Sequence, residues 1–225
     1  MKKNLMMTIV LVFLFGCSLI PVEWMPVAWI PVRPALQEDI SAPAGKVEGN
    51  QFTGIRYSFN VSAPPHWKIT AEFPDFLEKL GYDRPFSTDK EQTELYAYNP
   101  ETKSTITFDF TPTGRYQRFN QKIIEILTNS ATASMIAELD KEFGKGAIKP
   151  EFYPTEPYSL KGVQYAAKKY ATYTARGQKR EQGWIYGFTE PYQIFIIYSI
   201  FERPGVNDRE DLKKILDSFE YIPKR

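Results

Sequence analysis

The sequence predicts an α+β domain in which a largely antiparallel sheet is sandwiched by helices. Three observations predict this fold. Apolar and polar residues alternate in several segments after residue 50, and this period of two is typical of half-buried strands. Residues 119–143 instead repeat their apolar side chains at three- and four-residue steps, as a helix does. The last strand-like segments are joined by short turns, which makes neighbouring strands antiparallel.

The first strand of the predicted domain covers residues 55–61, where apolar and polar side chains alternate from Ile55 to Val61. Pro64 and Pro65 end this strand because proline cannot donate to a sheet ladder. The next expected elements are a short helix at 74–80 and two strands, 95–98 and 106–110, joined by a hairpin loop at 99–103.

A long helix is expected over 119–143, with one apolar stripe facing the core. Gly144 follows the stripe, at the position where glycine commonly ends a helix. The stripe contains Phe119, Ile123, Ile126, Leu127, Ala131, Met135, Ile136, Leu139 and Phe143. Prolines at 150, 154 and 157 predict a connector after this helix.

Three strands and a helix are expected to complete the domain. The strands are predicted at 163–175, 180–189 and 192–201, with turns at 176–179 and 190–191. The strand at 192–201 is apolar on both sides and should therefore be central, with a layer on each face. The closing helix is expected to begin at Asn207, with Glu210 at the spacing of a capping box.

The N-terminus has the layout of a secretory signal. Lys2 and Lys3 precede an apolar run from Leu5 to Phe15, which is shorter than the roughly 20 residues that cross a bilayer. Leu14-Phe15-Gly16-Cys17 resembles the lipobox of bacterial lipoproteins, in which the cysteine becomes the lipidated first residue. We expect a signal peptide at 1–16 and lipidation of Cys17, with the bilayer as its partner. The alternative is an uncleaved membrane helix running toward Val22.

A proline-spaced segment follows Cys17 and predicts a tether over residues 17–50. Pro21, Pro26 and Pro31 recur every five residues and favour an extended backbone. Trp24 and Trp29 are suited to a membrane–water interface, so one hypothesis places this segment along the lipid headgroups. The alternative is a stiff spacer. Residues 35–50 are expected to be linker and residues 51–225 the globular domain.

The complete order of elements carries a family resemblance. An opening strand followed by Pro64-Pro65-His66-Trp67, a mid-chain helix, three strands and a closing helix ending Ser218-Phe219 resembles the Mog1/PsbP-like α/β/α sandwich. The resemblance covers residues 52–222. The PsbP side of this family includes photosystem extrinsic proteins and small bacterial lipoproteins. The resemblance implies a non-catalytic binding or assembly role, and it assigns no functional residue to this chain.

Composition and motifs argue against several classes of chemistry. A net charge of +1 gives no electrostatic support for nucleic-acid binding. One cysteine and one histidine exclude an internal disulfide and zinc sites built on several such residues. His66 is expected to be a turn histidine packed on Trp67. No nucleophile-elbow, phosphate-binding or calcium-loop motif is present, so we predict no catalytic residue, no metal site and no cofactor.

Two groups of residues are candidate contact surfaces. No acidic residue interrupts the series of cations from Lys161 to Arg180, and Arg176, Lys179 and Arg180 should project at a hairpin tip. This tip would contact anionic lipids or an acidic partner, or else form a solvated turn. Aromatic side chains of the last strands would line a ligand groove or simply pack on the sheet. They are Tyr165, Tyr170, Tyr173, Trp184 and Tyr186.

The sequence is compatible with three functions. The favoured hypothesis is a lipid-anchored envelope lipoprotein whose domain binds a protein partner and catalyses nothing. The second is a lipoprotein that binds a small ligand or glycan in a concave aromatic pocket between sheet and helix. The third is a carboxylate-based enzyme. The expected location is the bacterial cell envelope, facing the periplasm. The resemblance to bacterial lipoproteins slightly favours the outer membrane, because Ser18 after Cys17 is not an inner-membrane retention signal of the Asp type.

Overall fold

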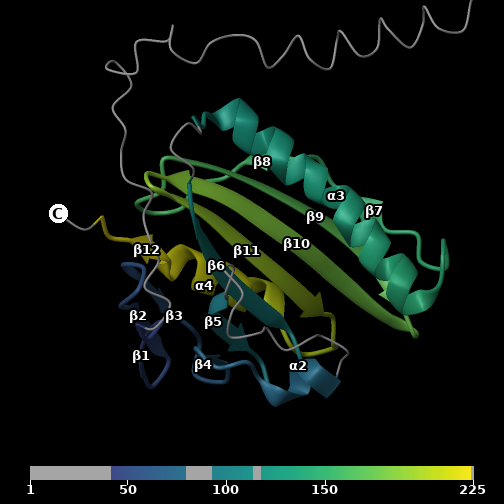
Figure 1. Ribbon diagram of the computed structural model, residues 1–225. Helices are drawn as coiled ribbons and strands as arrows, with labels where there is room; N and C mark the ends of the chain where they lie inside the picture. Colours follow the sequence, from purple (N-terminus) through teal and green to yellow (C-terminus); the bar gives the residue numbers. More distant parts are fainter. Residues whose placement is uncertain (1–41, 80–92, 114–117, 224–225) are drawn as a thin grey trace, which may run out of the picture. The chain divides into compact units, whose positions relative to one another are not determined.

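An antiparallel sheet forms the middle layer of the computed structural model, which describes residues 42–79, 93–113 and 118–223 (Figure 1). Its strands follow the order β4-β5-β6-β11-β10-β9-β7, and β8 also pairs with β9. The strands are β4 (Lys68–Thr70), β5 (Thr93–Tyr98), β6 (Thr105–Pro112), β7 (Glu151–Phe152), β8 (Glu156–Pro157), β9 (Tyr165–Ala175), β10 (Gln178–Thr189) and β11 (Tyr192–Phe201).

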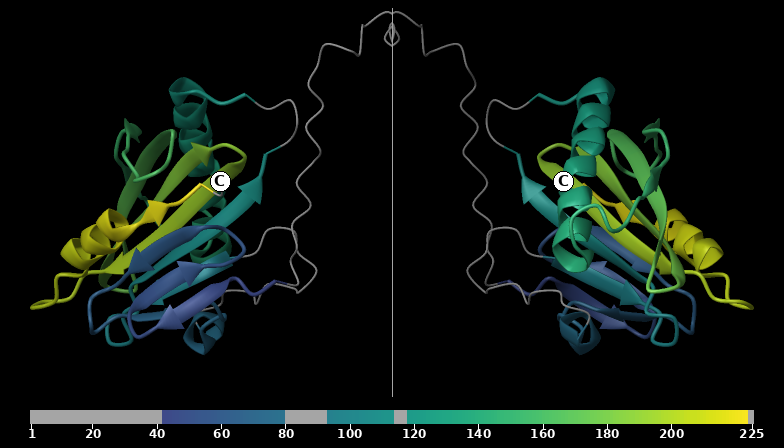
Figure 2. Two further views of the ribbon diagram at one scale, coloured as in Figure 1. Left: turned by 90° about the vertical axis from the view of Figure 1, so that its left-hand side faces the viewer. Right: turned by 90° about the vertical axis from the view of Figure 1, so that its right-hand side faces the viewer.

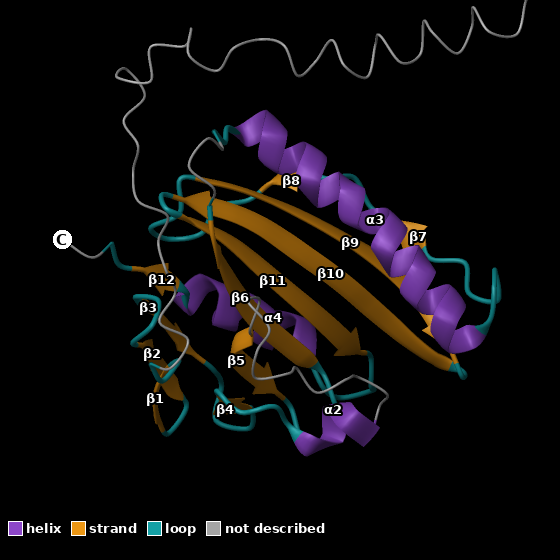
Figure 3. Ribbon diagram, in the orientation of Figure 1, coloured by secondary structure: helices purple, strands orange, loops and turns teal. Residues whose placement is uncertain are grey.

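Different layers cover the two faces of this sheet (Figures 1 and 2). The long helix α3 (Gln121–Phe143) packs on β9 and β10 from one side. The other side carries α4 (Asp208–Ser218) and a small antiparallel sheet, and the short helix α2 (Asp75–Lys79) follows β4. The small sheet contains β1 (Gly45–Glu48), β2 (Gln51–Gly54), β3 (Phe59–Ser62) and β12 (Glu220–Tyr221). The predicted α+β class with helices on both sides of an antiparallel sheet is confirmed (Figure 3).

The strand β11 is central, as its two apolar faces predict. It pairs with β6 on one side and with β10 on the other. Its even-numbered residues, such as Ile196 and Tyr198, are buried in the core beneath α4. Phe195 points to the opposite face, where its ring packs on Tyr186, 4.3 Å away. The strand is therefore central, with its even-numbered face buried and its odd-numbered face mostly half-buried.

Phenylalanine rings fill the core between the large sheet and the layer of α4 and the small sheet. Phe59 of β3 packs against Phe110 at 4.7 Å and against Phe219 at 5.8 Å between ring centroids. The rings of Phe108 and Phe219 are stacked 5.9 Å apart. The residue that ends the closing helix therefore joins α4 to the middle of the large sheet.

The long helix ends where predicted and begins two residues later than predicted, and its buried face is narrower than predicted. Asn120 caps it, accepting a hydrogen bond from the Ile123 amide, and Gly144 follows at φ 97°. Ile126 is 59% exposed, although it belongs to the predicted stripe, while Ile124 is fully buried. Successive residues turn about 100° around a helix, so Ile126 lies about 200° from Ile124 and faces away from the sheet.

The predicted strand over 55–61 is correct only in its second half: β3 begins at Phe59, and residues 55–57 form a bend. β2 and β3 form an antiparallel pair, and Ile55 in the connection between them is 48% exposed. Gly54 permits the turn because a Cβ there would clash with the carbonyl oxygen of Tyr57. The strand β1 lies inside the stretch expected to be linker and pairs with β2.

Candidate ligand-binding groove

A groove of about 740 Å³ lies between α4 and the β8–β9–β10 part of the large sheet. Strand alternation positions its floor, because even-numbered residues of β9 and odd-numbered residues of β10 face α4. The lining residues are Tyr153, Glu156, Tyr158, Lys168, Tyr170, Thr172, Lys179, Glu181, Asn207, Arg209, Glu210, Leu212, Lys213 and Leu216. The groove thus combines aromatic rings, charges of both signs and an apolar edge from α4.

Three tyrosines form the aromatic part of the groove. The rings of Tyr153 and Tyr170 are stacked, with centroids 4.2 Å apart and planes 12° from parallel. Tyr158 comes from the segment just after β8, so two of the three rings belong to the proline-rich connector. Within the part of the chain that the structure describes, no group hydrogen-bonds to the hydroxyl of Tyr153, Tyr158 or Tyr170. These hydroxyls are therefore available to a ligand.

Lys168 supplies the central cation of the groove. Its Nζ lies 5.4–5.6 Å from the ring centroids of Tyr158, Tyr170 and Tyr198. Among the described residues no carboxylate lies within 4.0 Å of this ammonium. Burial lowers the pKa of Lys168, and the charges of Glu181 and Glu156 offset only part of that effect.

Glu181 anchors a buried network at the groove floor. Its Oε1 accepts a hydrogen bond of 3.1 Å from the Tyr198 hydroxyl, and its Oε2 accepts one of 2.9 Å from Nε of Arg209. Burial raises the pKa of Tyr198, and the negative charge of Glu181 raises it further. Both carboxylate oxygens of Glu181 are occupied, so the network fixes the floor of the groove. Of the four cations that line the groove, Lys168 is the one without an ion pair to a described residue.

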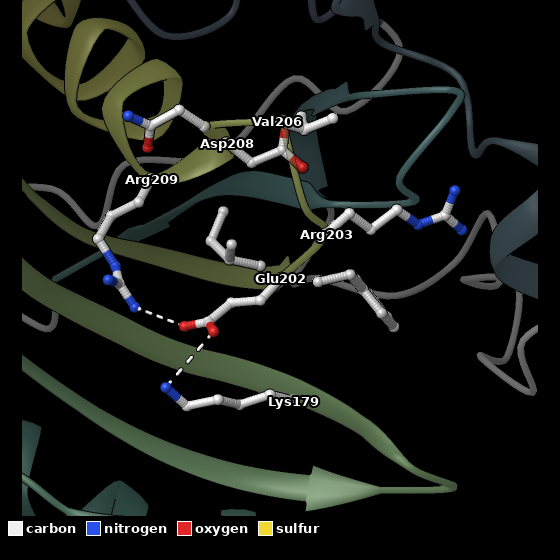
Figure 4. A pocket seen from close by; sticks show the side chains of 9 residues that line it. Lys179, Glu202, Arg203, Val206, Asp208 and Arg209 are labelled. Carbon is white, nitrogen blue, oxygen red and sulfur yellow. Dashed lines mark hydrogen bonds and ion pairs between the residues drawn. The ribbon is translucent and has the colours of Figure 1, made fainter.

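A second hollow of about 340 Å³ adjoins the groove and shares Lys179, Asn207 and Arg209 with it. Figure 4 shows Arg209 and Lys179 both pointing at Glu202. The Arg209 guanidinium is 3.1 Å from one oxygen of Glu202, and Nζ of Lys179 is 3.4 Å from the other. Lys179 and Arg209 are therefore both paired with acids of the protein itself.

The predicted basic hairpin tip does not form one free surface. Arg176 and Arg180 both lie over the ring of Phe143 at the end of α3, at 5.4 and 5.9 Å. Lys179 points to the opposite side of the hairpin, toward Glu202. Alternation along β10 separates these cations because neighbouring residues of a strand face opposite sides.

The structure places one of the five aromatic candidates in the groove. Tyr170 lines it, whereas Tyr165, Tyr173, Trp184 and Tyr186 pack on the face covered by α3. The indole nitrogen of Trp184 donates a 2.6 Å hydrogen bond to the Thr128 carbonyl of α3. Lys168 and Tyr170 are both even-numbered residues of β9 and therefore share one face of the sheet. The alternation of the sequence could have predicted that these two side chains lie together.

The predicted membrane contacts, Cys17, Trp24 and Trp29, lie outside the described residues. Of the helices that the structure does describe, none has both the length and the apolar character required to cross a bilayer.

His66 belongs to a second cluster that sequence reasoning missed. It was expected to be a turn histidine packed on Trp67, yet its Nε2 lies 2.7 Å from Oδ2 of Asp211 in α4. The Trp67 indole also donates to Asp211, at 3.3 Å, and Asp208 lies close enough for the three side chains to hold a cation. Asn207, in the predicted capping position, starts the helix that brings both carboxylates here.

The donor set of this cluster is already engaged by protein groups. Asp208 accepts hydrogen bonds from Asn99 at 2.8 Å and from Ser104 at 2.6 Å. Asp211 accepts from His66, from Trp67 and, through its other oxygen, from Lys214 at 3.1 Å. The arrangement therefore fits a network that fastens α4 to the strands better than it fits a metal centre.

Acid should weaken this network. Burial opposes the charge of Asp211, but hydrogen bonds from Lys214 and His66 outweigh burial and hold the pKa of Asp211 below its ordinary value. A depressed folded-state pKa contributes stability that is present above the unfolded value, about 3.9, and is lost as the pH falls through the folded value. We expect the free energy of unfolding to fall more steeply below about pH 5 in the wild type than in Asp211→Asn.

Urea unfolding measured from pH 7 to pH 3 checks this expectation. Asp217→Asn is the matched control because Asp217 is an exposed carboxylate of the same helix, paired with Lys213. Parallel pH curves for the wild type and Asp211→Asn would contradict the assignment.

The comparisons with known proteins concern the fold. No protein-family model matches the sequence, and no curated protein matches it. Solved structures with a similar fold include the three described next. LpqN, involved in cell envelope biogenesis of Mycobacterium tuberculosis, is 11% identical with a TM-score of 0.48, and the match covers 74% of this chain and 84% of LpqN. The PsbP protein of Synechocystis, CyanoP, is 10% identical with a TM-score of 0.46, covering 80% of this chain and 100% of CyanoP.

The third structure is a protein from Bacteroides thetaiotaomicron, 9% identical with a TM-score of 0.45; the match covers 79% of this chain and half, 50%, of that protein. CyanoP is a PsbP protein, the family that the sequence resembles, and its likeness to this chain concerns the fold alone.

Proposed function

We propose that this chain is a lipid-anchored protein of the bacterial cell envelope whose globular domain binds a ligand without transforming it. The observation that carries the binding role is the groove, in which a half-buried Lys168 faces tyrosine rings and has no ion pair among the described residues. Its volume of about 740 Å³ falls within the roughly 300–1,000 Å³ of small-ligand sites.

The groove favours ligand binding over the protein-partner hypothesis. A stable protein interface needs roughly 800 Å² on each partner, and such a surface is usually broad. Here the polar groups converge inside a concavity between sheet and helix, as the second sequence-based hypothesis requires. The buried acid at its floor, Glu181, is held by Arg209 and Tyr198, which supports a structural role for that acid over general-base catalysis.

Lipid anchoring rests on the signal and the lipobox-like segment before Cys17. Alanine at position 17 cannot carry acyl chains, and several such chains are needed for stable anchoring. We therefore expect Cys17→Ala to move the protein from the membrane fraction to the soluble fraction, or to leave it unprocessed. Immunoblots of fractionated cells measure this outcome, with Ser18→Ala as the control. A Cys17→Ala protein that is processed and remains in the membrane fraction would contradict lipid anchoring.

A photo-crosslinking amino acid at Tyr158, in the full anchored protein, tests ligand binding in the groove. The matched control carries the same group at Ser130, an exposed residue of α3 on the other side of the large sheet. After irradiation of cells, intact-mass spectrometry should detect a defined small-ligand adduct at position 158 and none at position 130. No adduct at either site, or the same adducts at both, would overturn the proposed function.

A further inference from the structure

We propose that the groove binds an acidic saccharide, with the carboxylate of one sugar pairing with Lys168 and the sugar rings packing on the tyrosines. This inference rests on the proposed function and names the chemical class of its ligand. It depends on three properties of the lining: one ammonium without an ion pair among the described residues, acceptor carboxylates around it, and partly exposed aromatic rings.

The ammonium of Lys168 lacks a counter-anion among the described residues. Moving a charge out of water costs free energy unless the charge is paired, and the three tyrosine faces supply only part of that compensation. Arg209 and Lys179 do not share this need, because Glu181 and Glu202 already pair with them. A ligand carboxylate would therefore form the ion pair that the protein itself does not provide to Lys168.

The acids of the groove favour a ligand whose negative charges are well separated. Glu156 on β8 lies directly across from Lys168 in the β8–β9 register, and Glu210 projects from the first turn of α4. The lining contains four cations and three acids, so a polyphosphate would meet repulsion from Glu156 and Glu210. A single carboxylate on each ring satisfies Lys168 without crowding these acids.

The same acids and the tyrosines favour a polyhydroxylated ring. The carboxylates of Glu156 and Glu210 accept hydrogen bonds from hydroxyl groups, and the hydroxyls of Tyr153 and Tyr158 can both donate and accept them. Aromatic faces carry partial negative charge and attract the weakly positive C–H face of a sugar ring. An acidic peptide would use Lys168 but would leave most of these hydroxyl-binding groups unused.

Isothermal titration calorimetry on the detergent-solubilised, full-length mature protein provides the test. The probes are trigalacturonate, its fully methyl-esterified form, and triglutamate. The acid and ester share their rings and differ in charge, so the wild type should bind trigalacturonate at least about tenfold more tightly than the ester. Triglutamate, with carboxylates but no sugar rings, should bind more weakly than trigalacturonate.

Variants of Lys168 assign the effect to its charge. Lys168→Met should abolish the preference for the acid over the ester, whereas Lys168→Arg should keep most of it. Lys161→Met is the matched control, because Lys161 is an exposed lysine that pairs with Glu220 and does not line the groove. Thermal melts of all variants establish that the comparison is made between folded proteins.

The outcomes separate this inference from the proposed function. Equal binding of acid and ester, or an acid preference that survives Lys168→Met, would overturn the assignment to an acidic sugar at Lys168. Tighter binding of triglutamate would overturn the saccharide class. If no probe binds but the crosslinker at position 158 captures a ligand, the inference fails and the proposed function stands; if that crosslinker also captures nothing, both fail.

Discussion

Gly183→Ala is expected to lower the free energy of unfolding by about 3 kcal/mol, near the upper end of typical overpacking costs. Gly183 lies on β10, directly opposite Tyr198 of β11. A Cβ at position 183 would lie 2.6 Å from Cε1 of Tyr198 and closer still to its hydroxyl end. The ring is fully buried and its hydroxyl is bonded to Glu181, so it cannot move aside without breaking the groove floor.

Gly187→Ala is the matched control for this prediction. Gly187 lies on the same strand and the same face, opposite Ile194, and a Cβ there would meet neighbours at 3.2 Å or more. Chemical unfolding should therefore show a clearly smaller loss for Gly187→Ala. A Gly183→Ala, Tyr198→Leu double variant should lose less than the sum of the two single variants, because leucine removes the clashing atoms. Strict additivity would show that the contact with Tyr198 is not the cause.

Local patterns predicted most of the elements of this fold. Asn207 does begin the closing helix, with its side chain accepting a hydrogen bond from the Glu210 amide, and β11 is central as its apolar faces predicted. These features depend on residues that are neighbours in sequence or on the period of one strand. The turn at Ile55 was missed because alternation continues through it, and only the close approach of Tyr57 to Gly54 reveals the bend.

The candidate sites were harder to predict because both join residues that are distant in sequence. His66 and Asp211 are 145 positions apart, and no local pattern connects them. The groove depends on the short strand β8, whose pairing with β9 brings Tyr158 and Glu156 over Lys168. A proline-rich segment gives little sign of pairing with a sheet edge, so it was expected to be only a connector.

Asp208→Ala is expected to have the largest effect of the substitutions considered, a loss of about 4 kcal/mol in the free energy of unfolding. Asp208 is buried at the start of α4 and accepts hydrogen bonds from Asn99 and Ser104, both of which are buried in and next to the β5–β6 hairpin loop. Truncation leaves two buried donors without an acceptor, and each such group costs about 1–3 kcal/mol. Removing the buried charge recovers some desolvation energy, but it also takes a favourable negative charge from the helix N-terminus.

Urea unfolding of three variants separates these contributions. Glu210→Ala removes an exposed acid from the same helical turn, so it reports the effect of the helix dipole alone and should cost less than about 1 kcal/mol. The Ser104→Ala and Asp208→Ala substitutions should be coupled by at least about 1 kcal/mol, because each removes the partner of the other. If Asp208→Ala costs no more than Glu210→Ala, the phenylalanine core and not this carboxylate holds α4 to the β5–β6 hairpin. Phe108 of β6 and Phe219 at the end of α4 already link these two elements.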